Sequence, residues 1–412
     1  MKRILTLLIC AVFLTTFQMF GNQQESQIEM KVRAFISSPD EISKILTTYP
    51  DIVYVEPGRY IDLFISQSDY QKLLKYDLAT EILIPDLTQY YSELMAGLED
   101  FGPYYTYQET TERLDLIQKT YPSITKKVEI GKSWEGRSIW AFKISDHPEK
   151  EEKEVEILFT GLHHAREPVG VSICLDFIEY LCREYQIDNK EVKKIVNKTQ
   201  LWFVPIINPD GYVYNETYSS MLWRKNKREE PGSVDLNRNY PFQWGCDDIG
   251  SSPDPWDETY RGPEPASEPE VQAIINFCQK HHFYLAINYH SYGNQILYPW
   301  GYTRSYTPDH EKFRKIAEMI RSINHYENGT ISEQLYLSNG DAIDWMYGWA
   351  KIFAFTLEVG EDFWQPDEKV INQQVDENIK VNLMLIGGAI EAKRSLLSKI
   401  FSKILGIFKF LF

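Results

Sequence analysis

A histidine and a glutamate three positions apart follow a short apolar run that predicts a buried strand. The run at 157–159 leads into the sequence Gly-Leu-His-His-Ala-Arg-Glu, in which His164 and Glu167 share one turn. An imidazole nitrogen and a carboxylate oxygen at this spacing can bind one divalent metal ion. The spacing alone carries little weight, because His-x-x-Glu arises by chance in many chains as part of a surface loop.

Three further apolar runs lead into polar residues that could join the same site. One is followed by Asn208, the next by His290 and the last by Glu358. In an open α/β sheet, ligands bind in the crevice outside the carboxyl ends of the strands. A third histidine and a second carboxylate at such positions therefore predict a site at this edge.

Two neutral imidazoles and one carboxylate are the ligand set of hydrolytic zinc. His164, Glu167 and His290 would leave a zinc ion an open position for water, unlike the ligands of a structural site. His163 adjoins the site, but two neighbouring residues in a turn seldom bind the same ion. The same ligands would also accept cobalt, nickel or copper, and zinc is expected from geometry and availability.

The elements that must position these residues predict an α/β domain with a mixed, mostly parallel central sheet flanked by helices. Four apolar runs are too continuous for a half-exposed sheet and indicate strands buried on both faces. They lie at 157–159, 201–207, 284–288 and 352–357. Helical patterns at 169–185 and 268–281 separate them. We assign residues 107–394 to this domain.

A smaller module is predicted before it. Residues 22–86 show the order strand, helix, strand, strand, helix, strand, which is typical of an α+β ferredoxin-like module with Gly58 at its hairpin turn. An acidic, aromatic connector follows at 87–106. It contains no Lys or Arg, so a trypsin-like protease could not cut it. The module is therefore released by another specificity or stays attached.

Both ends of the chain carry apolar segments. Residues 1–21 begin with two cations and continue as an apolar run, which predicts a signal peptide and a secreted or extracytoplasmic protein. An uncleaved anchor stays open, because no clear cleavage site follows. Residues 395–412 place lysines at helical spacing among large apolar residues, as in an amphipathic helix on a membrane surface. The alternative is a last helix that docks on the core or a partner.

The composition indicates a folded, acidic protein. Hydrophobic residues make up 43% of the 412 residues and aromatic residues 14%, which argues against disorder. The formal net charge of -16 repels phosphate backbones, so nucleic acid is not an expected partner. Nothing in the sequence indicates an oligomeric state.

In combination, the motifs resemble the zinc metallocarboxypeptidase family of the carboxypeptidase A and T type, over about residues 107–392. The resemblance implies removal of single residues from peptide C-termini, and a first module like an inhibitory propeptide. A permanent accessory domain is the alternative reading of that module. The motifs are His-x-x-Glu, Trp223-Arg224-Lys225, Asp235-Leu236-Asn237-Arg238-Asn239, Glu258-Thr259-Tyr260-Arg261-Gly262, His290-Ser291-Tyr292, Leu335-Tyr336 and the stretch from Ile343-Asp344-Trp345 to Glu358.

The resemblance also implies catalytic roles. Glu358 would be the general base that takes a proton from zinc-bound water and passes it to the leaving amine. Arg224 would stabilise the developing oxyanion, and Asp235 would accept a hydrogen bond from His164 and fix its tautomer. Without the resemblance, Glu358 could be a capping carboxylate and Arg224 part of a solvated basic loop.

Further residues would bind the substrate. Asn237 and Arg238 resemble the pair that holds the terminal carboxylate, a task for which a planar guanidinium is suited. Tyr336 corresponds to the mobile tyrosine that closes over the terminal residue. Arg166 would face the next residue inward.

Two positions bear on specificity. The family reads the terminal side chain at the position of Ile343, where an aliphatic residue resembles the carboxypeptidase A pattern and favours apolar ends. Asp341 could instead place a carboxylate near this pocket and admit Lys or Arg ends. Because a buried unpaired carboxylate is costly, Asp341 is expected to be exposed or answered by a cationic substrate. We predict a hydrophobic preference with room for dual, basic specificity.

Two other functions are alternatives to this one. An amide hydrolase that trims peptidoglycan stem peptides would use the same zinc site but act poorly on ordinary peptides. A non-catalytic peptide-binding module would be expected to lose a metal ligand or the base, and the sequence retains all four of these residues.

Overall fold

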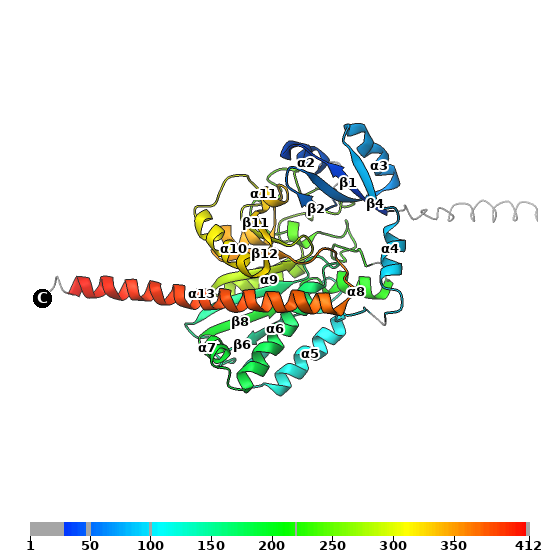
Figure 1. Cartoon of the computed structure of the whole chain (residues 1–412). Coiled ribbons are helices and arrows are strands. Elements are labelled where there is room, and N and C mark those ends of the chain that lie inside the picture. Colours follow the sequence, from blue (N-terminus) through cyan, green and yellow to red (C-terminus); the bar gives the residue numbers. More distant parts are fainter. Residues whose placement is uncertain (1–28, 47–50, 99–100, 219–220, 409–412) are drawn as a thin grey trace, which may run out of the picture.

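Two sheets organise the part of the chain that the computed structural model describes, which is residues 29–46, 51–98, 101–218 and 221–408. A four-stranded sheet belongs to the N-terminal module and an eight-stranded sheet to the larger domain (Figure 1). The signal peptide expected at 1–21 lies outside the described residues. No described helix has the length and apolarity needed to cross a bilayer.

The N-terminal module has the predicted order of elements. These are β1 (Glu29–Phe35), α2 (Pro39–Leu46), β2 (Ile52–Glu56), β3 (Tyr60–Ser66), α3 (Gln67–Leu73), the 3-10 turn η1 (Leu74–Tyr76) and β4 (Thr80–Ile84). The strands pair antiparallel in the order β2-β3-β1-β4. Gly58 lies between β2 and β3 with a φ of 71°, which is the left-handed conformation that this hairpin requires.

The connector packs on the larger domain. It begins with α4 (Leu87–Leu94), whose first turn is capped by the Asp86 side chain. Leu87 and Tyr91 are buried, and the Tyr91 hydroxyl donates a hydrogen bond to Asp362. The connector therefore contacts the larger domain through α4.

The larger sheet is mixed and mostly parallel, as predicted. Its strands run in the order β11-β10-β12-β9-β7-β8-β6-β5. The neighbours from β12 through β9 and β7 to β8 are parallel, as are β10 and β11, and the other pairs are antiparallel. The strands are β5 (Thr125–Lys132), β6 (Ser138–Ile144), β7 (Val155–Gly161), β8 (Thr199–Val204), β9 (Phe283–His290), β10 (Gln295–Tyr298), β11 (Glu327–Thr330) and β12 (Phe353–Glu358).

Helices cover both faces of this sheet. On β7, Ile157 and Phe159 belong to the core under one set of helices, and Leu158 to the core on the opposite face. The first core is covered by α5 (Tyr107–Thr120), α6 (Val169–Gln186), α10 (His310–Asn324) and α13 (Glu368–Phe408). The second core is covered by α9 (Pro269–Lys280) and α12 (Ala342–Gly348). Shorter elements are α7 (Lys190–Val196), α8 (Pro209–Tyr218), the 3-10 turn η2 (Leu236–Arg238) and α11 (Ile331–Gln334).

Helix α13 extends well beyond the body of the domain. Its first part packs against the sheet through buried residues such as Ile371, Ile386 and Ile390. The helix then continues without interruption and leaves the body (Figure 1). The side chains of 394–408 and all of 409–412 lie outside the description, and the amphipathic tail predicted at 395–412 falls on them.

Candidate metal and peptide site

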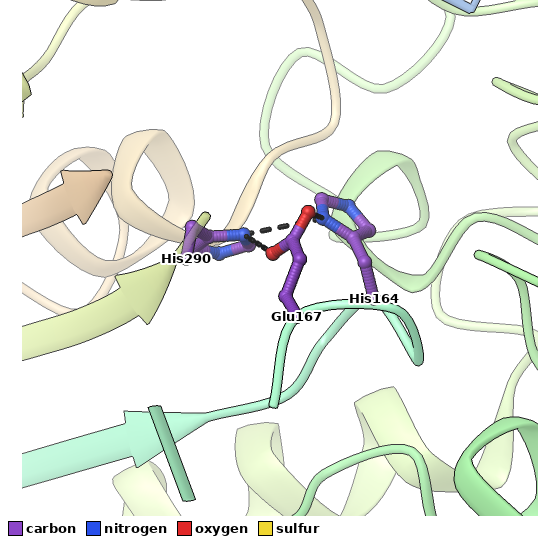
Figure 2. A group of neighbouring side chains, drawn as sticks. All are labelled: His164, Glu167 and His290. Carbon is purple, nitrogen blue, oxygen red and sulfur yellow. Dashed lines mark hydrogen bonds and ion pairs between the residues drawn. The ribbon is translucent and has the colours of Figure 1, made fainter. Parts of the chain in front are cut away.

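The three predicted metal ligands meet at the carboxyl ends of two neighbouring strands. His164 and Glu167 lie in the turn after β7, and His290 is the last residue of β9. Each Nδ1 atom of His164 and His290 is 2.8 Å from a different oxygen of Glu167, and the two Nδ1 atoms are 3.2 Å apart (Figure 2). All three side chains are buried. One atom from each therefore faces a common point.

The donor set of this cluster fits a zinc ion. One ligand atom from each residue lies within 4.8 Å of the others. Two imidazole nitrogens and a carboxylate oxygen are ligands that zinc prefers. Facing Nδ1 atoms cannot both accept from each other, whereas two neutral Nδ1 lone pairs can share a cation.

Burial and charge favour the metal-binding protonation states of His164 and Glu167, whereas for His290 the effect of burial is outweighed by Glu167, which raises the pKa of this histidine. Burial, followed by the nearby Arg224 cation, lowers the pKa of His164. Burial opposes ionisation of Glu167, but the two histidines outweigh it and lower the pKa of this carboxyl. A neutral imidazole and an ionised carboxylate are the forms that bind metal.

His163 does not join the cluster. Its Nε2 atom is 2.9 Å from the Tyr240 hydroxyl, and its ring stacks on His290 with the centroids 5.4 Å apart. Burial lowers the pKa of His163. The His163 ring therefore packs against the His290 ring and does not offer a nitrogen to the metal site.

Strand register brings Glu358 to the same place. Strands β9 and β12 pair in parallel with His290 opposite Glu358. Glu358 is half-buried and lines the cavity that also contains His164 and Glu167. Desolvation raises the pKa of Glu358, partly offset by His290. A carboxylate with a raised pKa is able to accept and return a proton near neutral pH.

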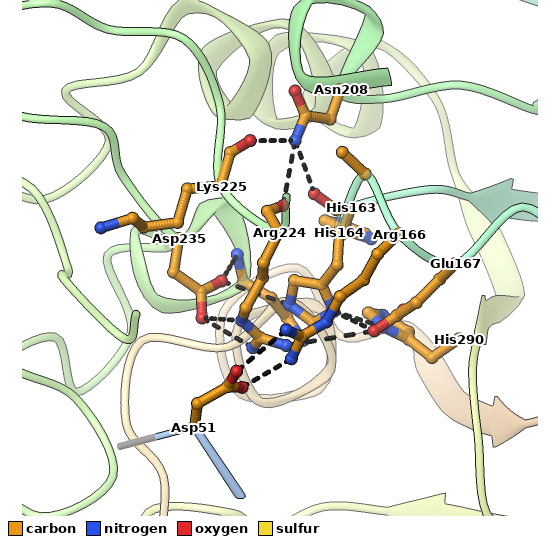
Figure 3. Close-up of polar contacts among 12 residues, drawn as sticks. Asp51, His163, His164, Arg166, Glu167, Asn208, Arg224, Lys225, Asp235 and His290 are labelled. Atoms are coloured by element: carbon orange, nitrogen blue, oxygen red, sulfur yellow. Dashed lines mark hydrogen bonds and ion pairs between the residues drawn. The ribbon is translucent and has the colours of Figure 1, made fainter. Parts of the chain in front are cut away.

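Arg224 and Asp235 form a second layer around the ligands. Arg224 donates to Asp235 through Nε at 3.1 Å and Nη2 at 2.7 Å, and its Nη1 is 4.0 Å from Glu167 (Figure 3). Asp235 Oδ1 also lies 3.2 Å from His164 Nε2. Asn208 donates from Nδ2 to the carbonyls of His163 and Lys225, at 3.2 and 3.0 Å. These contacts fix the turn against the segment that carries Arg224.

The residues expected to bind a terminal carboxylate also line the cavity. Arg238 donates from Nε to the Gly250 carbonyl at 2.6 Å and from Nη2 to the Tyr336 hydroxyl at 3.2 Å. Asn237 accepts from the Ala342 amide at 2.9 Å. Asn237, Arg238 and Tyr336 face the same cavity as the metal ligands.

Of the two positions expected to set specificity, Asp341 lines the cavity and Ile343 does not. Ile343 is the second residue of α12, is buried in the core, and is not among the residues that line the described cavity. Asp341 does line it, although only 2% of the side chain is exposed. Its Oδ1 caps α12 by accepting from the Asp344 amide, and Oδ2 has no hydrogen-bond partner among the described residues. Burial raises the pKa of Asp341 to about 6.

The N-terminal module fills one side of the cavity, as its resemblance to an inhibitory propeptide implies, through residues that the sequence did not single out. Asp51 accepts two hydrogen bonds from Arg166, at 2.6 Å from Nη2 and 3.0 Å from Nη1 (Figure 3). Residues 52–55 line the cavity, and Tyr54 stacks on Tyr292 at a centroid distance of 6.3 Å. No local signal could have found Asp51, because its partner lies 115 positions away.

Comparisons with known proteins agree with this geometry. The family model for zinc carboxypeptidases matches residues 110–381. The chain is 30% identical over 335 residues to carboxypeptidase A6 of Mus musculus, covering 75% of each chain. It is 31% identical over 337 residues to a zinc carboxypeptidase of Saccharothrix mutabilis subsp. capreolus, covering 73% of this chain and 76% of that one. The fold is similar to that of carboxypeptidase A from Helicoverpa armigera, with a TM-score of 0.77 at 22% identity over 89% of this chain and 99% of that one.

Proposed function

This chain belongs to the zinc carboxypeptidase family and is a metallocarboxypeptidase, and we propose that it hydrolyses the last peptide bond of peptides with Glu358 as general base. One observation carries the proposal. The cluster of His164, Glu167 and His290 opens into the same cavity as Glu358 and Arg238. A hydrolytic site and a carboxylate-binding cation in one cavity are what an exopeptidase requires.

The metal would be held by His164, Glu167 and His290. When bound, zinc supplies Lewis-acid polarisation of the scissile carbonyl and lowers the pKa of water. Glu358 would take a proton from the attacking water onto its carboxylate and deliver it to the leaving amine. Arg224, close to Glu167 and held by Asp235, would add positive charge near the oxyanion.

Arg238 and Asn237 would hold the terminal carboxylate. The Arg238 fork can donate parallel hydrogen bonds to it, and its contact with the Tyr336 hydroxyl supports the closing role of that tyrosine. Arg166 would contact the next residue inward once Asp51 has left it.

The terminal side chain would meet a mixed pocket. Leu297, Ile331 and Leu335 give the cavity apolar walls, which support a preference for hydrophobic ends. The buried Oδ2 of Asp341 supports a second specificity for Lys or Arg ends, because a cation would supply the missing partner. Hydrophobic preference with dual, basic specificity is therefore our proposal.

The N-terminal module would act as an inhibitory propeptide. Asp51 occupies Arg166, and residues 52–55 occupy the cavity that a substrate would enter. Secretion through the segment 1–21 would suit a zymogen, because the module would keep the enzyme inactive until export. The assignment of 22–86 to the propeptide, 87–106 to the connector and 107–394 to the catalytic domain follows from this proposal.

A test uses peptides that differ only in their last residue. The zinc-loaded chain, before and after limited proteolysis of the connector, is incubated with them and the products are identified by mass spectrometry. Stepwise loss of single terminal residues is expected, stopped by a chelator and absent for amidated ends. Release from amidated ends would contradict the carboxylate-binding role of Arg238, and no release with zinc bound would turn attention to cell-wall fragments or a binding role.

A further inference from the structure

The sequence 395–412, which begins within α13, combines apolar and cationic residues in a regular pattern. From Ser395 to Phe412 the sequence has three lysines and no acidic residue. When this sequence is projected at the roughly 100° per residue of an α-helix, every leucine, isoleucine and phenylalanine except Phe410 falls on one half of the circumference. The serines, Gly406 and the lysines fall on the other half. This is the pattern of a helix that lies in a membrane interface.

The described contacts of α13 with the body of the protein lie before this segment. Ile386 and Ile390 are buried, Glu391 and Ala392 are exposed, and Lys393 donates a hydrogen bond to the Lys153 carbonyl. Helix α13 then continues as one element to Phe408 and leaves the body (Figure 1).

The point of exit lies at the edge of the sheet opposite the active site. An apolar hollow there is lined by residues of α10, α13 and the first residues of β9 and β12. Two of them, Tyr284 and Met319, are 43% and 48% exposed. Strands β9 and β12 begin at this hollow and end at His290 and Glu358. At about 3.3 Å per residue, the length of β9 separates the two places by roughly 25 Å.

We propose that residues 395–412 hold the enzyme on an anionic lipid surface, with the active-site cavity facing the solution. The apolar half of the helix would enter the boundary between headgroups and acyl chains, and the lysines would contact acidic headgroups. The chain as a whole carries a net charge of -16. The same surface would therefore repel the acidic body while it attracts the tail, which favours this orientation.

Charge argues against a second copy of the chain as the occupant. Pairing two tails through their apolar halves would bring Lys399, Lys403 and Lys409 of each copy together, and neither tail offers an acidic partner. The acidic bodies would also repel each other. An anionic membrane offers acidic headgroups to the lysines and acyl chains to the apolar half of the helix.

Flotation with lipid vesicles tests the proposal. The chain beginning at Asn22 is used, so that the apolar run near residue 10 does not itself bind lipid. We expect it to float with phosphatidylcholine vesicles that contain one quarter phosphatidylglycerol, and to bind pure phosphatidylcholine much less. Ile400→Glu with Ile404→Glu should lower binding at least about tenfold, because charges replace buried apolar groups. Lys399→Gln with Lys403→Gln should lower binding to the anionic vesicles by roughly fivefold for each lysine.

Two controls keep the result specific to the tail. Leu116→Glu introduces a charge at an exposed apolar position on α5 and should leave flotation unchanged. Peptide hydrolysis in solution should be equal in all variants, which shows that the body is folded. The proposal is overturned if the chain does not float, or if the paired isoleucine substitutions leave flotation intact. It is also overturned if the tail instead mediates a lipid-free dimer, seen by sedimentation velocity, that the same substitutions dissociate.

Discussion

Glu358 is the residue on which the proposed chemistry depends most directly. Glu358→Gln keeps the size of the side chain but cannot accept a proton, so kcat should fall by about 10³-fold. Zinc content and the binding of a non-hydrolysable peptide should stay nearly unchanged, because Glu358 is not a proposed ligand. Steady-state kinetics, metal analysis and calorimetry measure these three quantities.

A neighbouring carboxylate provides the matched control for this substitution. Glu361 is exposed and lies three positions further along the chain, so Glu361→Gln should behave like the parent protein. Full turnover in Glu358→Gln would remove Glu358 from the role of base.

Asp341 should control activity on basic ends. In Asp341→Asn, the cationic end of a substrate loses a buried partner, which costs about 3 kcal/mol, or roughly 100-fold in kcat/KM. Peptides with apolar ends should be affected little and serve as the internal control. Equal losses for both kinds of peptide would mean that Asp341 supports the fold of the pocket and does not select substrates.

The same residue predicts a pH dependence. Burial raises the pKa of Asp341 to about 6, and only the ionised form attracts a cationic end. The ratio of kcat/KM for Lys-ended over Phe-ended peptides should therefore rise between about pH 5 and pH 7 and level off above. In Asp341→Asn the ratio should be flat, which the pH profiles of both proteins would reveal.

The residues that end strands were predictable from the sequence, and those that depend on distant partners were not. His164, Glu167, His290 and Glu358 each follow an apolar run, and parallel strands carry such residues to one edge. The sequence does not show whether a side chain at the start of a helix points into the cavity or into the core. Asp341, the N-cap of α12, reaches the cavity, while Ile343 turns into the core.

At the scale of elements, the first helix of the larger domain depends on its N-terminal cap. Thr106 Oγ1 accepts from the Glu109 amide at 3.1 Å, and the Glu109 carboxylate accepts from the Thr106 amide at 2.8 Å. Thr106→Ala should lower the stability by about 1 kcal/mol. Thermal unfolding should show a lower Tm for this variant. Thr106→Ser keeps the hydroxyl and should match the parent, and a loss in both would point to another cause.

Central strands were easier to predict than edge strands. Strands β7, β8, β9 and β12 are covered on both faces, so their apolar residues run without a break. Strands β5, β6, β10 and β11 lie toward the edges of the sheet, and the pairing of β6 with β8 and of β10 with β12 depends on contacts far along the chain. The strand propensity of a residue and the periodicity of apolar residues do not indicate such distant contacts.

At the scale of the whole molecule, Asp51 should set the activity of the intact chain. Asp51→Asn leaves the buried Arg166 guanidinium without its ionic partner, which weakens the module contact by about 3 kcal/mol, or roughly 100-fold. Peptide hydrolysis by the intact variant should rise toward that of the chain freed of its module. Asp77→Asn alters an exposed carboxylate of the same module and should change nothing. An intact Asp51→Asn chain as slow as the parent would contradict the inhibitory role.

The structured connector has a consequence for how strongly the module must bind. While the chain is continuous, the connector holds the module near its cavity at an effective concentration in the millimolar range. The contacts of the module, among them the Asp51–Arg166 ion pair and Tyr54 stacked on Tyr292, then need only modest affinity to keep the cavity filled. A cut in the connector would replace this fixed local concentration with that of the bulk solution. Dilution alone would then release the module, so the extent of activation would depend on the protein concentration after secretion.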